Sequence, residues 1–585
     1  MTTIHHETDN TDNMMTGAEA LLRSLVAEGV DTVFGYPGGA ILPVYNALYD
    51  FGPELRHILV RHEQGAMHAA QGYARATGRT GVVIVTSGPG AANCVTGLSD
   101  AMMDSTPLVL ITGQVGASYL GSDAFQETDV VAVTTPITKW AYQVRSAEEL
   151  PEAVARAFYI ASTGRPGPVV LDISKDAQIG MVAFSHRRVN FIRSYDPDPA
   201  PSAETLARAA RLLNEAERPM IIAGGGVTLA GAEASLTALA EKARIPVAAT
   251  LMGLSAMPSD HPLFMGMAGM HGAVGVNIAT NRADVILAVG MRFDDRVTGN
   301  TASYARQARI IHIDIDSSEF NKTVAANVTV HGDARDVLAR LLPLVRPVDA
   351  AARAPWLEVF ARCAEAERAD VDSRELHRGG DLPMTMGEVS RLVSEMAPAG
   401  TIAVTDVGQN QMMAARYFNF TAPRSMITSG GLGTMGFGLP AAMGAAVGVP
   451  DRTVCYFGGD GGFQMTVQEL GTIMQYRIPV KMIVMDNSFL GNVRQWQQLF
   501  FGGRFSQTPL QNPDFVALAA AYGIAAERVD QRDALPDAIR RMLGHDGPYL
   551  LDVAIDPTDM VFPMTPVGRP VDFIMLTPDK TYSYE

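Results

Sequence analysis

Cysteine is scarce in this chain, and basic residues are outnumbered by acidic ones. The three cysteines, Cys94, Cys363 and Cys455, lie far apart and form no CxxC pair, which excludes a disulfide scaffold and a zinc knuckle and is typical of a reducing compartment. The formal net charge of −16 implies no broad basic surface and argues against a nucleic-acid-binding protein. No uninterrupted apolar run of 18 residues occurs, so the sequence predicts no transmembrane helix.

Apolar residues are abundant enough for several large cores, at 47% of a 585-residue chain, and global disorder is therefore excluded. Residues 1–13 are polar and poor in arginine. We interpret them as a disordered tail and not as a signal or transit peptide, and we expect a cytoplasmic protein.

Short β-branched runs alternate with helix-like segments along the chain. Residues 81–85 (GVVIV), 107–113 and 167–173 are continuous apolar runs, as expected for parallel strands buried on both faces. Similar runs follow at 220–225, 284–290, 309–315, 401–407, 453–459, 480–487 and 549–555. The sequence thus predicts an α/β protein with three doubly wound parallel-sheet domains. The expected boundaries are a tail at 1–13, domains at 14–185, 203–346 and 383–565, linkers at 186–202 and 347–382, and a C-terminal tail at 566–585.

The most specific pattern is Gly459-Asp460-Gly461, which begins at the last residue of the run 453–459 and is separated from Asn487 by 25 residues. In a βαβ unit this spacing places Asp460 and Asn487 at the carboxyl ends of two parallel strands, where open α/β sheets bind ligands. Carboxylate, amide and carbonyl oxygens suit Mg2+ that also binds phosphate, and the glycines allow close approach of an anion. The alternative, an Asp-Gly turn without a ligand, is disfavoured by the spacing and the strand context.

Here the chain resembles the thiamine diphosphate enzymes, whose signature is GDG followed by Asn. The resemblance implies a Mg2+ site formed by Asp460, Asn487 and the main-chain oxygen of Phe489. It also assigns Glu63, in RHEQGAMHAAQGYAR, as the catalytic carboxylate that shares a proton with N1′ of the cofactor. Without that context, Glu63 would be interpreted as a residue that serves the N-terminus of a helix, and His68 as a packed helix residue.

Further motifs narrow the resemblance to the acetohydroxyacid (acetolactate) synthases. FGYPGGAILPVY (34–45), VTSGPGAAN (85–93), GSDAFQE (121–127), MRFDDRVTGN (291–300) and SGGLGTMGFGLPAA (429–442) all fit that family, in order. The family fold consists of a pyrimidine-binding, a central and a diphosphate-binding domain. The implied transferase decarboxylates pyruvate and transfers a hydroxyethyl carbanion to pyruvate or 2-ketobutyrate, giving 2-acetolactate or 2-aceto-2-hydroxybutyrate for valine, leucine and isoleucine synthesis.

Residue roles follow from the resemblance. Thiamine diphosphate would be bound by Gly39, Glu63, Asn93, Gln409, Asn410, Gly433, Met435, Asp460, Gly461, Gly462, Asn487 and Gly491. Substrate would be bound by Phe125, Gln126, Lys175, Arg296 and Trp496. Within these sets Arg296 would pair with the carboxylate of the acceptor ketoacid, and Trp496 would favour 2-ketobutyrate.

The central domain carries glycine-rich turns but no GxGxxG, so spacing alone is weak evidence for a dinucleotide site. The resemblance implies a structural FAD, because catabolic acetolactate synthases lack RFDDRVTGN. The flavin would be bound by Arg165, Gly224, Gly225, Gly226, Thr250, Leu251, Met270, His271, Gly290, Arg292, Asp294, Asp314, Ile315, Gly332 and Asp333.

The resemblance further implies a homodimer or homotetramer, in which Glu63 of one chain meets the GDG site of another, and a small regulatory subunit. It predicts neither a nucleic-acid nor a membrane partner. Three positions depart from the family pattern: Asn410 replaces a usual His, Met413 a usual Trp, and Asn492 a usual Met. Two alternatives remain open, another thiamine diphosphate enzyme such as a pyruvate oxidase, glyoxylate carboligase or 2-ketoacid decarboxylase, and a catalytically silent homologue.

Overall fold

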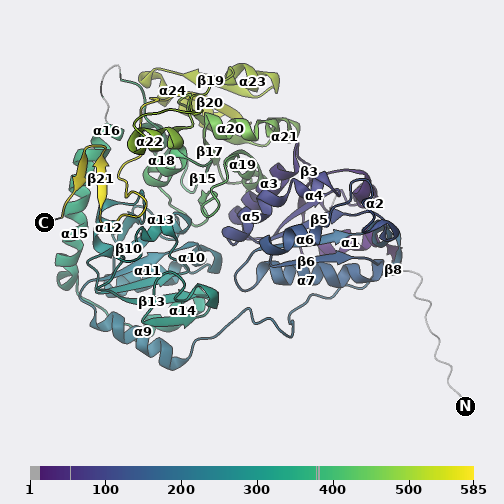
Figure 1. Ribbon diagram of the computed structural model, residues 1–585, viewed down its shortest axis with the longest axis horizontal. Helices are drawn as coiled ribbons and strands as arrows, with labels where there is room; N and C mark the ends of the chain where they lie inside the picture. The colour runs from purple at the N-terminus through teal and green to yellow at the C-terminus, as the bar shows by residue number, and fades with distance from the viewer. Residues whose placement is uncertain (1–12, 53, 377–378, 380–381, 585) are drawn as a thin grey trace, which may run out of the picture. The chain divides into compact units, whose positions relative to one another are not determined.

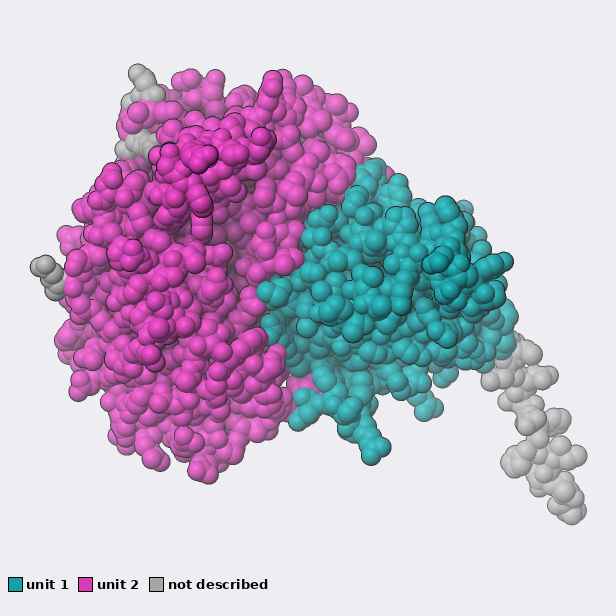
Figure 2. All heavy atoms as spheres, viewed as in Figure 1, with its two compact units in different colours: residues 1–196 teal, residues 197–585 magenta. Residues whose placement is uncertain are grey.

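The computed structural model describes residues 13–52, 54–376, 379 and 382–584. The chain divides into two compact units, residues 1–196 (unit 1) and 197–585 (unit 2) (Figure 2). The predicted tail lies, apart from Asn13, outside the described residues. In the described part of the chain, no helix is long and apolar enough to cross a membrane.

Unit 1 contains a six-stranded, wholly parallel sheet (Figure 1). One face packs against helices α1 (Gly17–Ala27) and α7 (Leu150–Ser162), whose apolar residues share a core with Val82 and Ile84. Alternate strand residues point to the opposite face, which is covered by α3 (Glu63–Thr77). The strands, in sheet order, are β3 (Arg56–Leu59), β2 (Thr32–Tyr36), β4 (Gly81–Val85), β5 (Leu108–Gly113), β7 (Pro168–Ile173) and β6 (Trp140–Val144).

Unit 2 contains two more six-stranded parallel sheets. The central sheet has the order β11 (Phe264–Met267), β10 (Val247–Ala249), β9 (Pro219–Ala223), β12 (Val285–Val289), β13 (Arg309–Asp314) and β14 (Val328–His331). The C-terminal sheet has the order β16 (Met426–Ile427), β15 (Ile402–Thr405), β17 (Val454–Gly459), β18 (Val480–Asp486), β20 (Tyr549–Ala554) and β19 (Ala525–Val529). The predicted fold class, three doubly wound parallel sheets, is confirmed, and each predicted strand lies within two residues of an observed one.

Two segments contain more regular structure than the sequence predicted. The segment 347–382 contains the 18-residue helix α15 (Ala350–Glu367), which docks on the central sheet because the buried indole N–H of Trp356 donates to the Pro219 carbonyl oxygen at 2.8 Å. The C-terminal segment forms a two-stranded antiparallel sheet of β21 (Ile574–Thr577) and β22 (Lys580–Tyr582). Both segments are therefore integral parts of the fold of unit 2.

Helix α3 shows how local sequence fixes the position of Glu63. The His62 ring accepts a hydrogen bond from the backbone N–H of Gln64 at 3.1 Å and caps the N-terminus. Gly78, at φ 77°, ends the helix in the left-handed conformation that glycine adopts at little cost. Alanine and glycine dominate between these caps, so the helix can approach the sheet closely. Glu63 is consequently the first helical residue after strand β3.

The buried ring of His68 in α3 predicts a pH dependence of stability. Burial, together with the nearby Arg75, lowers the pKa of His68 to about 3, whereas an unfolded histidine titrates near pH 6.5. The unfolded state therefore binds more protons below pH 6.5, and this residue's contribution to stability is lost as the pH falls from about 6.5 toward 3, by up to about 1.4 kcal/mol per pH unit. We expect His68→Met to flatten the fall of the thermal unfolding midpoint between pH 7 and pH 4.5. The exposed-site control His545→Met should keep the wild-type slope, and an unchanged slope in His68→Met would contradict the prediction.

Candidate active site

Two of the three sheets share one strand order, and both place predicted site residues at a point where the chain order reverses. Strand β2 lies between β3 and β4 in unit 1, and β15 lies between β16 and β17 in the C-terminal sheet. The connections that follow β2 and β4 run to opposite sides of the pair, and so do those that follow β15 and β17. This divergence opens a crevice at the carboxyl ends of the two strands. Each of these two sheets therefore has an edge of the kind at which open α/β sheets bind ligands.

Asp460 and Asn487 lie at the edge of the C-terminal sheet. Strands β17 and β18 pair in parallel with Gly459 opposite Met485, so the residues that follow them leave the sheet side by side. Asp460 is 1% exposed and Asn487 is 4% exposed. The Asn487 side-chain oxygen also accepts the backbone N–H of Phe489 at 3.1 Å, which folds the Asn487–Phe489 turn back on itself. The structure thus brings together the residues predicted to form the metal site.

The electrostatic environment of Asp460 fits a bound cation. Burial, with a contribution from the neighbouring Asp486 carboxylate, raises the pKa of Asp460 to about 7. A divalent ion would stabilise the charged form that burial disfavours. The available donors are one carboxylate, one amide oxygen and backbone carbonyls, which suit Mg2+. Among the described residues, no group of three or more His, Cys, Asp or Glu residues could hold a metal, so a transition-metal site of that type is not indicated.

Gln409 links this edge to the C-terminal part of the chain. It begins α18 (Gln409–Tyr417), and its side-chain oxygen accepts a hydrogen bond from Asn487 at 3.3 Å. Its amide nitrogen donates to the Gln495 side chain at 3.2 Å and to the Asp559 carbonyl oxygen at 3.0 Å. Asn410 is also buried and donates to the Phe457 carbonyl oxygen at 2.9 Å. Of the two predicted diphosphate contacts, Gln409 therefore lies beside Asn487 and Asn410 lies beside Gly459, although Asn410 is already bonded to the β17 backbone.

Asp406 is a residue of this site that the sequence did not single out. It follows β15, is fully buried, and accepts the backbone N–H groups of Gly436 at 3.0 Å and Gly438 at 3.1 Å. Burial raises its pKa to about 6. Gly462 lies so close that an added Cβ would overlap the Asp406 carboxylate. The sequence offers one signal for Asp406, namely that it is a charged residue near the end of the predicted strand 401–407.

The neighbouring turn carries Gly433 and Met435. Gly433 has a φ of 71°, and a Cβ added there would meet only the Val407 side chain, at 3.9 Å. Its backbone therefore borders open space. The Met435 methyl group lies 3.7 Å from the Cβ position of Gly461, so the structure brings this side chain to the GDG turn.

In unit 1, Glu63 is half-buried and accepts a hydrogen bond from the Asn93 amide at 2.9 Å. A Cβ at Gly90 would lie 3.5 Å from its carboxylate, and one at Gly39 would meet nothing within 4 Å. The Thr86 hydroxyl, which lies beside Gly38, is buried and has no hydrogen-bond partner among the described residues. These features form a carboxylate-bearing edge with an unsatisfied polar group and open backbone.

The three unit 1 residues predicted to line the substrate channel differ in position. Gln126 has a φ of 60°, and its backbone packs against Gly88 just beyond β4. Phe125 is 88% exposed. Lys175 is also exposed and begins α8 (Lys175–Ile179). Of the three, Gln126 is thus the one that the described contacts place next to the β4 edge.

The central sheet has the strand order 3-2-1-4-5-6, which is the order of dinucleotide-binding folds. Its reversal point lies between β9 and β12, where the Gly226 N–H donates to the Gly290 carbonyl oxygen at 3.0 Å. A Cβ on Gly226 would lie 2.6 Å from the Gly290 Cα, so both positions require glycine for this contact. Topology thus supports a dinucleotide site that sequence spacing alone supported only weakly.

The other predicted flavin residues of unit 2 lie along the same sheet edge or next to it. Asp294 caps α13 (Asp295–Thr298), and its carboxylate is 3.6 Å from Arg292. His271 is buried, with its ring 3.2 Å from the Pro563 carbonyl oxygen, and burial lowers its pKa to about 4. Those that follow a strand end are Gly224 and Gly225 after β9, Thr250 and Leu251 after β10, Asp314 and Ile315 at β13, and Gly332 and Asp333 after β14. Arg165 belongs to unit 1, where its Nε donates to the Ser105 hydroxyl at 2.9 Å.

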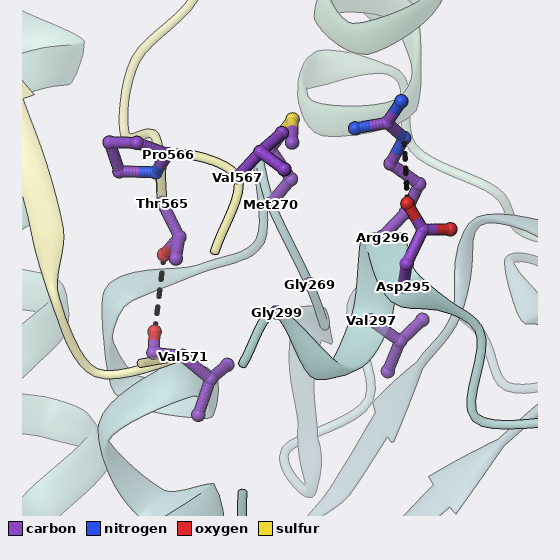
Figure 3. A pocket seen from close by; sticks show the side chains of 10 residues that line it. All are labelled: Gly269, Met270, Asp295, Arg296, Val297, Gly299, Thr565, Pro566, Val567 and Val571. Atoms are coloured by element: carbon purple, nitrogen blue, oxygen red, sulfur yellow. Dashed lines mark hydrogen bonds and ion pairs between the residues drawn. The ribbon is translucent and has the colours of Figure 1, made fainter. Parts of the chain in front are cut away.

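Arg296 lines a small pocket formed between residues 269–299 and residues 565–571 (Figure 3). Its side chain is 58% exposed, and its Nε lies 3.8 Å from the Asp295 carboxylate. Across the pocket, the Thr565 N–H donates to the Met270 carbonyl oxygen at 2.8 Å. The exposed guanidinium is therefore available to a small anionic ligand.

Helix α22 (Gly491–Phe500) presents the remaining predicted substrate residue, Trp496, whose ring packs edge-on against Phe500 at 5.7 Å between centroids. Asn492, one of the departures from the family pattern, has a buried side-chain oxygen with no hydrogen-bond partner among the described residues. The same helix thus carries both a predicted acceptor-pocket residue and an unusual polar group.

Comparisons with known proteins agree with this geometry. Family models of the thiamine pyrophosphate enzymes match three segments: the N-terminal TPP binding domain at residues 15–133, the central domain at 206–341 and the C-terminal TPP binding domain at 406–553. The protein is thus a thiamine pyrophosphate enzyme in class.

Curated relatives specify the branch of that class. The chain is 47% identical to the acetolactate synthase isozyme 2 large subunit of Escherichia coli K12, over 95% of this chain and 98% of that protein. It is 46% identical to a probable acetolactate synthase large subunit of Methanocaldococcus jannaschii, over 95% of this chain and 94% of that protein. It is 45% identical to the acetolactate synthase large subunit of Corynebacterium glutamicum, over 95% of this chain and 89% of that protein. The chain belongs to the acetolactate synthase large-subunit family.

The crowding around Gly491 predicts a selective defect in cofactor binding. A Cβ at Gly491 would overlap the Gln409 side-chain oxygen and lie 2.7 Å from the Asn487 amide nitrogen. Gly491→Ala must therefore displace one of these side chains, and we expect thiamine diphosphate to bind roughly tenfold or more weakly, as for other losses of outer-shell support. Quenching of tryptophan fluorescence by the cofactor at saturating Mg2+ measures the affinity. Gly544→Ala, where a Cβ meets nothing within 4 Å, is the matched control. Wild-type affinity in Gly491→Ala would contradict this account of the site.

Proposed function

We propose that the chain is the catalytic subunit of an acetolactate synthase. It would decarboxylate pyruvate and transfer the two-carbon unit to a second pyruvate or to 2-ketobutyrate, giving 2-acetolactate or 2-aceto-2-hydroxybutyrate in branched-chain amino acid biosynthesis. The observation that carries the proposal is identity of 45–47% to named acetolactate synthase large subunits over 95% of the chain. The juxtaposition of Asp460, Asn487 and Gln409 at one sheet edge supports it.

The cofactors of this proposal are thiamine diphosphate, Mg2+ and FAD. Thiamine diphosphate, when bound, supplies a carbon nucleophile and an electron sink. Asp460, Asn487 and the Phe489 carbonyl oxygen would hold Mg2+ against the diphosphate, while Gln409 orients Asn487 through their hydrogen bond. Residues 14–185, 203–346 and 383–565 would be the pyrimidine-binding, central and diphosphate-binding domains.

Glu63 would hold a proton between its carboxylate and N1′ of the aminopyrimidine. The Asn93 amide donates to one carboxylate oxygen at 2.9 Å, which fixes the rotation of the side chain and leaves the other oxygen for the cofactor. Because Glu63 is half-buried, less water can reach its carboxylate and compete for this proton. Positioning by Asn93 is therefore the contribution of this chain's own structure to proton transfer.

Arg296 would bind the carboxylate of the acceptor ketoacid, because its side chain is exposed at the pocket and its ion pair with Asp295, the one it makes among the described residues, is long at 3.8 Å. Trp496 would favour the larger acceptor, and Phe125, Gln126 and Lys175 would line the access route. FAD would be held at the central-sheet edge by the residues named above. We assign it a structural role, because the net reaction transfers no electrons.

We further propose a homodimer or homotetramer, with each active site completed across the interface, and a small regulatory subunit as partner. The support is that the chain divides its cofactor residues between two units, Glu63 and Asn93 in one and Asp460 and Asn487 in the other. The regulatory partner is supported by the names of the relatives, which are called large subunits. We expect the protein in the cytoplasm.

Product analysis tests the proposed reaction. Purified protein incubated with pyruvate, thiamine diphosphate and Mg2+, with and without FAD, is expected to form acetolactate in an FAD-dependent manner. Acetaldehyde, or acetate with peroxide, would instead identify a decarboxylase or an oxidase and overturn the proposal.

Glu63→Gln keeps the shape of the side chain but removes the acid, so we expect roughly 10²- to 10⁴-fold slower product formation with cofactor binding retained. Wild-type turnover in this variant would refute the role of Glu63.

Acceptor preference tests the role of Trp496. Replacing the indole by a smaller side chain removes apolar contact with the extra methylene of 2-ketobutyrate, which is worth about 1–3 kcal/mol in a hydrophobic pocket. In competition between pyruvate and 2-ketobutyrate as acceptors, Trp496→Leu should therefore lose roughly tenfold or more of its preference. Phe500→Leu changes the ring that Trp496 packs against and serves as the control. An equal loss in both variants would indicate helix packing instead of acceptor contact.

A further inference from the structure

The loop between α22 and α23 (Phe515–Ala521) braces the metal-binding turn of the proposed active site. The Leu490 N–H donates to the Thr508 carbonyl oxygen at 2.9 Å, and the Leu510 N–H donates to the Ser488 carbonyl oxygen at 2.8 Å. These two bonds tie the loop to the turn that follows Asn487. Asn512 lies two residues beyond Leu510 in the same loop.

Asn512 bridges two buried carboxylates that end neighbouring strands. Its amide nitrogen donates to Asp460 Oδ2 at 2.6 Å and to Asp486 Oδ1 at 2.8 Å. The Gln464 amide donates to the Asn512 side-chain oxygen at 3.0 Å. This arrangement fixes the orientation of the Asn512 amide, because the nitrogen must face the two acceptors and the oxygen must face the donor.

The surrounding charges are divided unequally between these carboxylates. Arg528 contacts Asp486 at 3.0 Å and also pairs with Asp552. No Lys, Arg or His in the described part of the chain forms an ion pair with Asp460. Asp486 and Asp552 therefore share a protein cation, whereas Asp460 is held by the neutral Asn512 amide and has no ion-pair partner in the described chain to compete with a ligand.

We propose that Asn512 is a positioning residue for Asp460, which orients the carboxylate for a divalent cation without neutralising it. By engaging Oδ2, the amide fixes the rotation of the carboxylate and leaves Oδ1 as the oxygen that can coordinate. A Lys or Arg at this place would compete with the metal ion, and an apolar residue would leave two neighbouring carboxylates without a shared donor. This inference rests on the proposed function, in which Asp460 is a Mg2+ ligand.

Binding of Mn2+, used as a spectroscopic substitute for Mg2+, tests the inference in the full-length protein. Titration followed by electron paramagnetic resonance, at saturating thiamine diphosphate, gives the affinity of the bound ion. We expect Asn512→Leu, which has a similarly branched but larger side chain with no donor, to weaken Mn2+ binding about 10- to 100-fold. Asn512→Ala should show the same loss and serves as the second variant if Asn512→Leu does not fold.

Two control variants distinguish a failure of the Asn512 proposal from a failure of the proposed metal site. Gln497→Leu removes hydrogen bonds to Thr508 at 2.9 Å and Ser506 at 3.0 Å in the same loop and should bind Mn2+ like the wild type. An equal loss in Gln497→Leu, or wild-type affinity in both Asn512 variants, would overturn the role of Asn512. Asp460→Asn should abolish binding. Wild-type Mn2+ affinity in Asp460→Asn would instead refute the proposed metal site itself.

Discussion

Parallel pairing between β17 and β18 is the constraint on which the candidate site depends. The register, with Gly459 opposite Met485, makes the two chain segments leave the sheet at the same edge. A slip of one residue would turn alternate side chains to the other face and would separate Asp460 from Asn487. Both strands are almost wholly buried, so the close packing of differently shaped side chains on each face fixes the register. The core of the sheet therefore determines the geometry of the site.

Polar side chains at that edge are held by each other and by close backbone approach. Gln409 connects Asn487 with Gln495 and the Asp559 carbonyl oxygen, and a Cβ at Gly491 would overlap its side-chain oxygen. Buried polar groups of this kind are costly when unpaired, so the network is stable only when every member is in place. We accordingly expect binding of the proposed cofactor to depend on local packing at this edge.

The central sheet and the segments around it form a second candidate site. The segment after β20 donates from Thr565 to Met270 and places Pro563 beside His271, while Arg296 lines the adjoining pocket (Figure 3). The same segment contacts Gln409 through Asp559. Residues proposed to bind flavin, acceptor and diphosphate are thus linked through one stretch of chain, so changes in that stretch are expected to influence all three.

The sequence by itself determined the fold class, ten strand positions and the GDG–Asn pair, because strands buried on both faces are continuous apolar runs and because βαβ spacing fixes the order of strand ends. Among the strands that it did not predict, β10 and β16 have three and two residues, too few to show a pattern. Helix α15 was interpreted as a linker, since Pro355 and many charged residues obscure its buried face. Asp406 and Asn512 emerged only from the tertiary structure. Neither belongs to a motif, and their significance lies in bonds to residues distant in sequence, Gly436 and Asp460 among them, which only folding brings within reach.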